Sequence, residues 1–160
     1  MAQRSAPRPE PSRADLAAMM TPLSRALIAA ELPILRAHEV SMWGYVVLNA
    51  LIEQPVRTQA ALAQAIGADK TRIIGVLDEL QQRGLIERTP DPTDRRAHLL
   101  DITVAGSALR DAVRADIQRG EERVLARLPP ADRKAFLRSL ATLAALPAEE
   151  ITGESPAPND

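Results

Sequence analysis

Apolar side chains recur at helical spacing along most of the chain, and this pattern predicts a mainly α-helical fold. The first run covers 16–34. Within it Thr21-Pro22 has the form of a helix start, and Pro33 is expected to kink the helix or end it. A second apolar helix is expected to begin after Ser41, a favourable N-cap, and to stop at Gln54-Pro55. The chain therefore begins with two expected helices joined by a short turn.

A helix-turn-helix pattern follows, with one helix expected over 58–67 and the next over 69–83. Two helices in this arrangement need a small residue inside the first helix and a glycine at the turn, and Ala63 and Gly67 supply them. The facing positions are apolar, namely Leu62, Ile66, Ala68, Ile73 and Val76. A plain helical hairpin, in which Gly67 only ends a helix, is the alternative for this stretch taken alone.

The second helix of this pair separates its side chains into two faces. The face expected to pack inward holds Ile73, Val76, Leu77 and Leu80. The N-terminal half of the outer face lies at the positive end of the helix dipole, which is the part of a recognition helix that enters the major groove. Lys70 and Arg72 can donate hydrogen bonds to guanine or phosphate, and Thr71 and Ile74 can contact a thymine methyl group.

Gly75, on the same outer face, lowers helix stability by ~1 kcal/mol relative to alanine, and close approach of DNA would explain it. Asp78 and Glu79 lie one turn later and would repel phosphate if they faced it. The predicted DNA-binding residues of the two helices are Thr58, Gln59, Lys70, Thr71, Arg72, Ile74 and Gly75. The alternative is that Lys70 and Arg72 are ordinary solvated charges.

After Gly84 the pattern changes from helical to alternating, which predicts strands over 85–89 and 97–103 around a turn-rich tip. Arg95 and Arg96 on this tip suit a narrow minor groove, and Asp91 and Asp94 can hold the tip by salt bridges. A polar turn whose charges have no function is the alternative. A helix-turn-helix followed directly by a β-hairpin is a winged helix.

Two further helices are expected over 104–128 and 132–146, separated by Pro129-Pro130. The small winged helix cannot cover the wide apolar stripes of these helices and of the first helix, so we expect a two-fold homodimer. The fold class is mainly α with a small β-hairpin wing, with 41–103 as the winged helix-turn-helix and 15–40 plus 104–146 as dimerisation helices. Residues 1–14 and the acidic tail 147–160 are expected to be disordered.

Three runs of this sequence resemble the MarR (multiple-antibiotic-resistance regulator) family. They are Leu80-Gln-Gln-Arg-Gly-Leu-Ile-Glu-Arg88, Asp91-Pro-Thr-Asp-Arg-Arg96 and Leu100-Asp-Ile-Thr-Val-Ala-Gly106. The resemblance implies a homodimeric winged-helix transcription regulator, usually a repressor that responds to a small ligand. By position, 70–75 match the recognition helix of the family and 94–96 match the tip of the wing. The related PadR-type regulators would have the same biochemistry.

The join between the first two helices borders the ligand pocket of that family, and it carries His38, Met42, Trp43 and Tyr45. These residues are the predicted contacts of an aromatic or phenolic effector, with packing of Trp43 and Tyr45 in the second helix as the alternative. The chain has no cysteine, so it lacks the thiol of the peroxide-sensing branch of the family. It also lacks the His/Cys/acid cluster of the zinc-sensing branch.

Composition narrows the function classes. The net charge of −1 seems to oppose DNA binding, but the last fourteen residues hold four acids and no base. Residues 57–100 hold seven basic and six acidic groups, so the expected DNA contact rests on a few cations at specific positions.

No catalytic triad, P-loop or metal set is present in the sequence, so we expect neither an enzyme nor a cofactor. We expect a cytoplasmic protein that binds double-stranded DNA and no membrane. A winged helix that binds protein rather than DNA is the rival reading.

Overall fold

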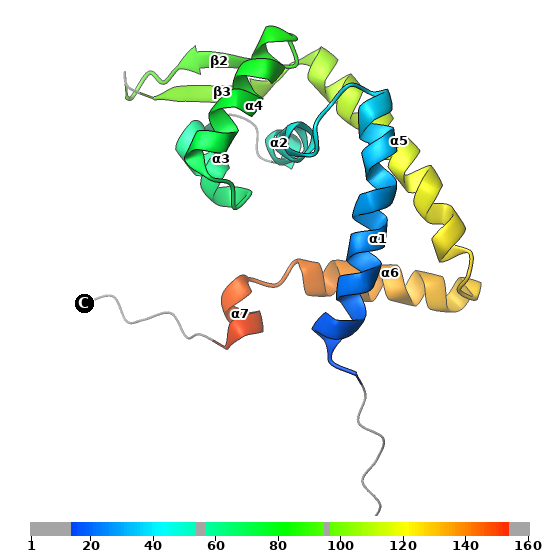
Figure 1. Ribbon diagram of the computed structural model, residues 1–160. Coiled ribbons are helices and arrows are strands. Elements are labelled where there is room, and N and C mark those ends of the chain that lie inside the picture. Colours follow the sequence, from blue (N-terminus) through cyan, green and yellow to red (C-terminus); the bar gives the residue numbers. More distant parts are fainter. Residues whose placement is uncertain (1–13, 54–56, 95–96, 154–160) are drawn as a thin grey trace, which may run out of the picture. The chain divides into compact units, whose positions relative to one another are not determined.

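The computed structural model describes residues 14–53, 57–94 and 97–153 (Figure 1). Its elements, in chain order, are α1 (Leu16–Ala37), α2 (Met42–Glu53), β1 (Arg57–Thr58), α3 (Gln59–Ala65), α4 (Lys70–Gln82), β2 (Ile86–Pro90), β3 (His98–Ile102), α5 (Val104–Leu125), α6 (Pro130–Ala144) and α7 (Ala148–Thr152). The chain divides into two compact units, one ending at Ile117 and the other beginning at Gln118. The mainly helical class with a β-hairpin wing is confirmed. The predicted arm 1–14 lies outside the described residues except for Ala14.

α1 is one continuous helix, which corrects the expectation that Thr21-Pro22 starts a helix and shows that Pro33 does not end it. Each proline removes the hydrogen bond to a carbonyl four residues earlier, and those carbonyls belong to the exposed residues Ala18 and Ala29. Water can replace a donor at exposed carbonyls, so the helix survives both prolines. Thr21 donates its hydroxyl proton to the Ala17 carbonyl at 2.6 Å and so sits inside the helix rather than capping it.

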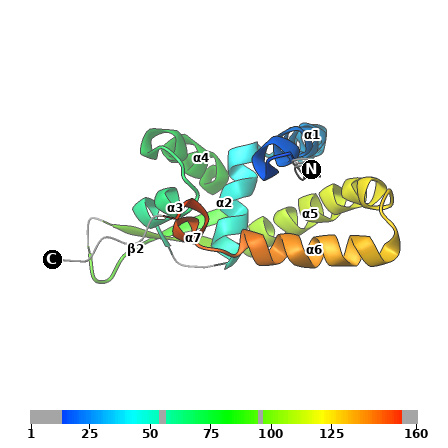
Figure 2. The ribbon, with the colours of Figure 1, turned by 90° about the horizontal axis from the view of Figure 1, so that it is seen from below.

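The core of the first unit lies where α2, α3, α4 and the sheet meet. Leu48, Leu51, Leu62, Leu77 and Leu100 are fully or almost fully buried there. The predicted inward face of α4 is confirmed, because Ile73, Leu77 and Leu80 are buried and Val76 packs against them. Seen from below (Figure 2), α2 runs between α1 and the helix-turn-helix, so it joins them within this unit.

The turn between α3 and α4 is fixed by local geometry. Gly67 has φ of 63°, in the left-handed region that favours glycine. Ala68 then donates its N–H to the carbonyl of the buried residue Ala63 at 2.9 Å. Thr58 caps α3 by accepting from the N–H of Ala61, and Asp69 caps α4 by accepting from the N–H of Thr71. The helix-turn-helix is therefore positioned by its own turn and caps.

The wing is an antiparallel hairpin in which Ile86 faces Ile102 and Arg88 faces Leu100. The short strand β1, absent from the sequence prediction, pairs with β3 and makes a three-stranded sheet in the order β1-β3-β2. At the base of the hairpin the hydroxyl of Thr103 donates to the Gly84 carbonyl and accepts from the N–H of Gly106. This hydroxyl connects the wing to the first turn of α5.

Gly106 lies against the backbone of Leu85, the residue before β2. A Cβ atom at Gly106 would lie 2.0 Å from the carbonyl oxygen of Leu85, so no larger residue fits without movement of the backbone. Further along α5, Arg110 donates to the amide oxygen of Asn49 at 2.7 Å, and Asp116 pairs with His38 at 2.8 Å. These contacts fix the N-terminal part of α5 on α2 and on the turn after α1.

The second unit contains α6 and α7. α6 begins with Pro130 at its first position and buries none of its residues in the described chain. The acidic tail differs from its prediction at Ala148–Thr152, which forms the exposed helix α7 rather than irregular chain. Pro147 precedes this helix. The negative charges of Glu149 and Glu150 in its first turn stabilise the helix, because they lie near the positive end of the helix dipole. Residues 154–160 lie outside the described part.

Among the described residues, α1 is the helix whose length and composition would allow it to cross a membrane. Core helices of soluble proteins and N-terminal signal segments meet the same test, so this is weak support for a membrane span. Its apolar residues Leu16, Met20, Leu23 and Leu32 are between 41% and 51% exposed, so the unit itself leaves them uncovered.

Candidate nucleic-acid interface

The N-terminal half of α4 presents an exposed surface made of the residues that the sequence singled out. Thr71, Arg72, Ile74 and Gly75 are all exposed, and Ile74 keeps 46% of its surface in solvent. For Lys70 the structure gives its place as the first residue of the helix. A large apolar side chain left in water on the outer face of a helix suits contact with a thymine methyl group.

Asp69 fixes the start of this surface. Its carboxylate accepts the N–H of Thr71 at 2.7 Å, which satisfies one of the free donors at the helix end. This backbone hydrogen bond is the main cause that lowers the pKa of Asp69 from its ordinary value of 3.8. Asp69 is therefore ionised near neutral pH and acts as a cap, although it places a negative charge beside the predicted DNA contacts.

Gly75 has no packing reason to be glycine within the described chain. A Cβ atom built at this position would meet no atom within 4 Å, and its φ is not in the left-handed region. The residue is exposed in the interior of α4, where glycine is unfavourable. The glycine lowers the stability of α4 with no compensating contact inside the described chain. This agrees with the prediction that DNA approaches the helix closely at this position.

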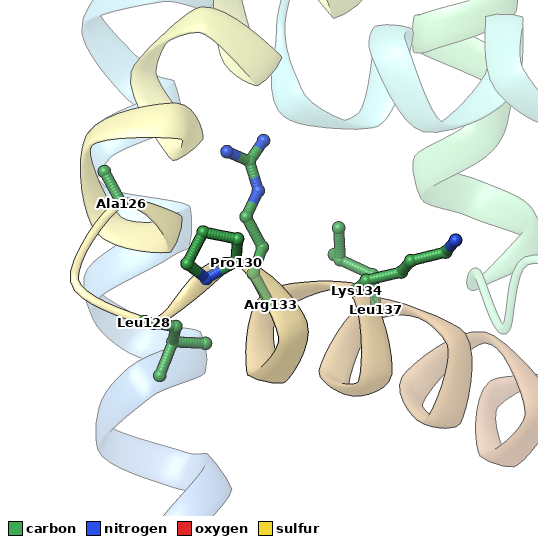
Figure 3. A pocket seen from close by; sticks show the side chains of 6 residues that line it. All are labelled: Ala126, Leu128, Pro130, Arg133, Lys134 and Leu137. Atoms are coloured by element: carbon green, nitrogen blue, oxygen red, sulfur yellow. The ribbon is translucent and has the colours of Figure 1, made fainter.

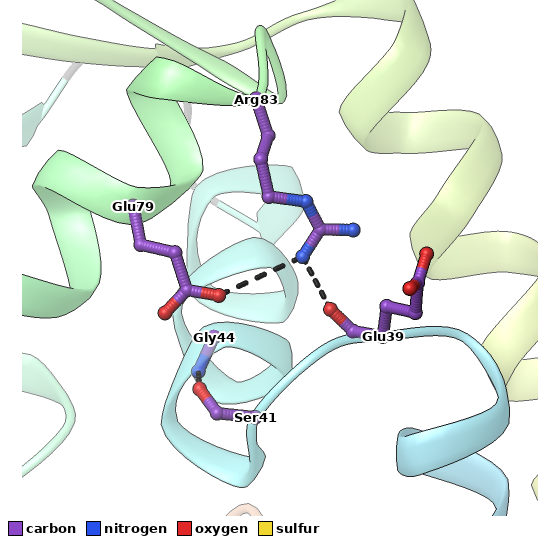
Figure 4. A network of polar contacts seen from close by, with 5 residues as sticks. All are labelled: Glu39, Ser41, Gly44, Glu79 and Arg83. Atoms are coloured by element: carbon purple, nitrogen blue, oxygen red, sulfur yellow. Dashed lines mark hydrogen bonds and ion pairs between the residues drawn. The ribbon is translucent and has the colours of Figure 1, made fainter.

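The acidic half of α4 is paired with arginine. Asp78 lies 2.7 Å from the guanidinium of Arg88 on β2, and Glu79 lies 3.7 Å from that of Arg83. Figure 4 shows that Arg83 also donates to the carbonyl oxygen of Glu39, in the turn between α1 and α2. The expected repulsion between these carboxylates and phosphate is thus reduced by neighbouring positive charge.

Arg88 was not among the predicted site residues, yet it joins the wing to α4. Only 21% of its side chain is exposed, and its Nε and Nη2 atoms are buried without a hydrogen-bond partner. A signal for this role was present in the sequence, because residues two apart on a strand share a face and Ile86 is buried. An arginine at that inward position needs a carboxylate, and Asp78 supplies it.

The tip of the wing is organised by Asp91. Its carboxylate accepts the N–H and the hydroxyl of Thr93, at 2.7 and 2.6 Å. The hydroxyl bond is the main cause that lowers the pKa of Asp91. Backbone bonds from Asp91 to Ala97 and from Ala97 to Asp94 close the loop. Asp91 thus supports the tip through Thr93, whereas the predicted contact residues Arg95 and Arg96 lie outside the described residues.

Thr58 and Gln59 occupy the start of α3 and are half-buried. The hydroxyl oxygen of Thr58 accepts the N–H of Ala61 at 3.2 Å, so this side chain stabilises the helix end. Its DNA contact remains a prediction, as does that of Gln59.

The four residues predicted to contact an effector interact with different elements of the first unit. His38 pairs with Asp116 on α5, while Met42 and Tyr45 pack against the hydrophobic core. Trp43 lies beside α4, where the guanidinium carbon of Arg72 is 5.8 Å from the centre of its ring. The structure therefore brings a predicted effector residue together with a predicted DNA-binding residue.

An open pocket lies elsewhere, in the second unit. It has a volume of ≈ 590 Å³ and is lined by Ala126, Leu128, Pro130, Arg133, Lys134 and Leu137 (Figure 3). Arg133 is held by the carboxylate of Glu122. Among residues 14–53, 57–94 and 97–153, no group of three histidine or acidic side chains could hold a metal ion.

Comparisons with known proteins agree with this geometry. A model of the MarR family matches residues 44–97. The HTH-type transcriptional repressor NicR of Pseudomonas putida is 33% identical over 93 residues, which are 58% of this chain and 59% of NicR. The chain spans about 60% of the length of the first relatives that it matches in sequence.

Two solved structures extend the likeness over most of the chain. The PcaV transcriptional regulator of Streptomyces coelicolor, solved with its natural ligand, is 29% identical with a TM-score of 0.60, over 83% of this chain and 96% of PcaV. The transcriptional repressor CouR, solved on a 23-mer DNA duplex, is 29% identical with a TM-score of 0.68, over 81% of this chain and 92% of CouR.

Proposed function

Because the chain belongs to the MarR family, we propose that it is a homodimeric, sequence-specific DNA-binding regulator of transcription. We propose further that it acts in the cytoplasm as a repressor and that a small ligand releases it from DNA. Its operator is a pseudo-palindrome, since a two-fold dimer presents identical surfaces to two half-sites. NicR and CouR, which carry the name of repressor, support the direction of regulation.

The observation that carries this proposal is the exposed N-terminal half of α4. It combines the cation Arg72, the exposed apolar side chain Ile74 and a glycine that no neighbour inside the chain requires. If this surface contacted solvent alone, neither the exposed Ile74 nor the helix-destabilising Gly75 would have a structural reason. The arrangement suits base edges and thymine methyl groups in a major groove.

The dimer is supported by apolar surface that each unit leaves uncovered. α1 exposes Leu16, Met19, Met20, Leu23, Ile28 and Leu32, and α6 exposes Phe136, Leu137, Leu140 and Leu143. Exposed apolar patches on soluble proteins often mark sites of interaction with another protein. A second copy of the chain would cover it and place two recognition helices about one DNA turn apart, roughly 34–36 Å.

The experiment is a gel shift on the promoter beside its own gene, at two salt concentrations, with a scrambled duplex of equal length as control. We expect a shift on the promoter that weakens as salt rises, because phosphate contacts release counterions. Arg72→Ala is expected to cost ~1–3 kcal/mol and to relax base preference at one position, whereas Arg95→Ala and Arg96→Ala weaken binding to all sequences more evenly. The absence of a shift at low salt would overturn the proposal.

A winged helix that binds protein instead of DNA is the competing function. It predicts no difference between the promoter and the scrambled duplex at any salt concentration. It also predicts that Arg72→Ala and an exposed change far from α4, such as Arg114→Ala, behave alike on DNA. The cationic start of α4 favours the regulator.

The effector in this proposal is a small aromatic or phenolic molecule that contacts the α1–α2 turn. Trp43 is half-buried there and offers a flat ring, with Met42 and His38 close in the chain. The PcaV structure, which contains a natural ligand, supports a ligand-responsive regulator. A panel of phenolic acids tests it through the emission of Trp43, the single tryptophan of the chain. Emission and promoter affinity that both stay constant across the panel would contradict an effector of this class.

A further inference from the structure

The guanidinium group of Arg72 on α4 lies over the indole ring of Trp43 on α2. The guanidinium carbon lies 5.8 Å from the centre of the indole ring, within the ~6 Å over which a cation is attracted to an aromatic face. Arg72 is otherwise exposed, whereas Trp43 is half-buried and held at the start of α2. Trp43 is therefore the more rigid of the two side chains, and the contact restricts the conformations of Arg72.

Arg72 lies on the flank of α4 that faces the turn between α1 and α2. Positions 72, 79 and 83 fall on one side of the helix, because their spacings of seven and four residues are close to whole helical turns. Arg83, on this flank, already donates to the carbonyl of Glu39, as Figure 4 shows. The contact of Arg72 with Trp43, the second residue of α2, is thus a second contact between this flank and the segment that joins α1 to the start of α2.

A guanidinium held by an aromatic ring keeps its hydrogen-bonding ability. The attraction is between the positive charge and the face of the indole ring, and it does not require the N–H donors of the guanidinium. Trp43 can therefore hold Arg72 from one side while the donors remain directed at a phosphate or a guanine. An arginine without such support loses more rotamer freedom when it binds.

We propose that Trp43 is a positioning residue for Arg72, which it holds ready for DNA without touching DNA itself. The proposal rests on the proposed function, in which α4 reads DNA. It connects the α1–α2 turn to the DNA-binding end of α4 through one side-chain contact. From the strength of such contacts at exposed sites, loss of the indole should weaken promoter binding about two- to five-fold.

The first test needs no DNA. Because Trp43 is the single tryptophan, its emission reports on the guanidinium that lies over its ring. We expect Arg72→Ala to change the emission wavelength or intensity of the free protein, and Arg114→Ala, which removes an exposed arginine from α5, to leave it unchanged. Identical spectra for wild type and Arg72→Ala would overturn the proposal.

The second test is a double-mutant cycle on the promoter duplex. Trp43→Leu keeps an apolar side chain but removes the aromatic face, and Trp43→Phe keeps an aromatic face. We expect Trp43→Leu to weaken binding about two- to five-fold in the wild-type background and not at all in the Arg72→Ala background. Trp43→Phe should restore about half of the lost affinity or more. Thermal melting of each variant checks that the fold is intact.

The outcomes separate this inference from the function on which it rests. Equal weakening by Trp43→Leu in both backgrounds, or none in either, would overturn the positioning role while the wild type still shifts the promoter. If the wild type fails to bind the promoter at low salt, the proposed function and the positioning role fail together. The emission test then still decides whether the two side chains touch.

Discussion

The guanidinium of Arg88 on β2 lies 2.7 Å from the carboxylate of Asp78 on α4, so an ion pair joins the wing to the second helix of the helix-turn-helix. The two partners differ in exposure, because 21% of the Arg88 side chain and 58% of the Asp78 side chain contact solvent. Two nitrogens of Arg88 are buried without another partner. Asp78 therefore matters more as the counter-charge of Arg88 than as a surface residue.

Loss of Asp78 is expected to destabilise the fold more than its exposed position suggests. Asp78→Ala leaves the largely buried Arg88 without its counter-charge, at an expected cost of about 1–3 kcal/mol in the free energy of unfolding. The double variant Asp78→Ala/Arg88→Met should recover part of this loss, because methionine keeps the apolar stem. Urea denaturation measures both. Glu122→Ala, in the more exposed pair with Arg133, is the control and should cost ~0–1 kcal/mol; equal costs would contradict the argument.

Gly75→Ala is expected to separate stability from DNA binding. The added methyl group meets open space, so alanine should stabilise the free protein by up to ~1 kcal/mol through helix propensity. The same methyl group lies on the face proposed to meet DNA, so promoter affinity should fall. Thermal melting and fluorescence anisotropy on the duplex measure the two effects. A variant that is more stable and binds the promoter as tightly as wild type would show that Gly75 has no role at the interface.

Gly106→Ala is expected to damage the junction between the wing and α5. Its Cβ would lie 2.0 Å from the Leu85 carbonyl oxygen, so the backbone must move. Overpacking of this kind costs roughly 1–3 kcal/mol or more. Gly120→Ala is the matched control on the same helix, since its Cβ meets only the end of the Arg123 side chain at 3.9 Å. Differential scanning calorimetry should show a lower melting temperature for the first variant and not for the second.

The cap of α4 gives a pH dependence with a definite sign. Asp69 has a folded-state pKa below its ordinary value of 3.8, chiefly because its carboxylate accepts the N–H of Thr71. The stability due to its ionised form is complete above pH 3.8 and is lost as the pH falls through the lower folded-state pKa. Asp69→Asn also caps helices but does not titrate in this range. Urea midpoints from pH 5 downward should therefore fall less steeply for Asp69→Asn than for wild type.

The exposed face of α6 offers a test of the dimer. Leu140 is 37% exposed, and Leu140→Asp would place a charge in the apolar surface that a second copy is proposed to cover. Light scattering should find a dimer for wild type and a larger monomer fraction for the variant. Lys134→Ala, a change at an exposed polar position of the same helix, is the control. A wild-type monomer at micromolar concentration would contradict the homodimer.

The sequence predicted the parts of the fold that depend on local pattern. The turn at Gly67, the buried face of α4 and the strands that pair Ile86 with Ile102 follow from apolar spacing and glycine placement. Strand β1 was not predicted, because two residues are too few to show the alternation of polar and apolar side chains that marks a strand. It forms because Arg57 pairs with Leu100, which lies far along the chain. The helix does not end at Pro33, because its exposed backbone tolerates a lost hydrogen bond.

In the candidate site, too, the sequence predicted the residues that depend on local pattern and missed the contacts that depend on tertiary packing. The exposed residues of α4 could be predicted from the two faces of one helix. The inward position of Arg88 could be read from the strand pattern, but its partner Asp78 could not. The contact between Trp43 and Arg72 could not be predicted either, because each pair joins side chains from separate elements whose approach depends on the packed core. Arg95 and Arg96 remain predictions from the sequence alone.

The hydroxyl of Thr103, which bonds to both Gly84 and Gly106, has a mechanical consequence. The close contact at Gly106 leaves no slack at this junction, so β3 and the first turn of α5 behave as one lever. We expect a rotation of α5 about its own axis to carry the hairpin with it, and the Asp78–Arg88 pair to pass part of that torque to α4. A change at one end of this lever should therefore shift together the two elements that we propose to contact DNA.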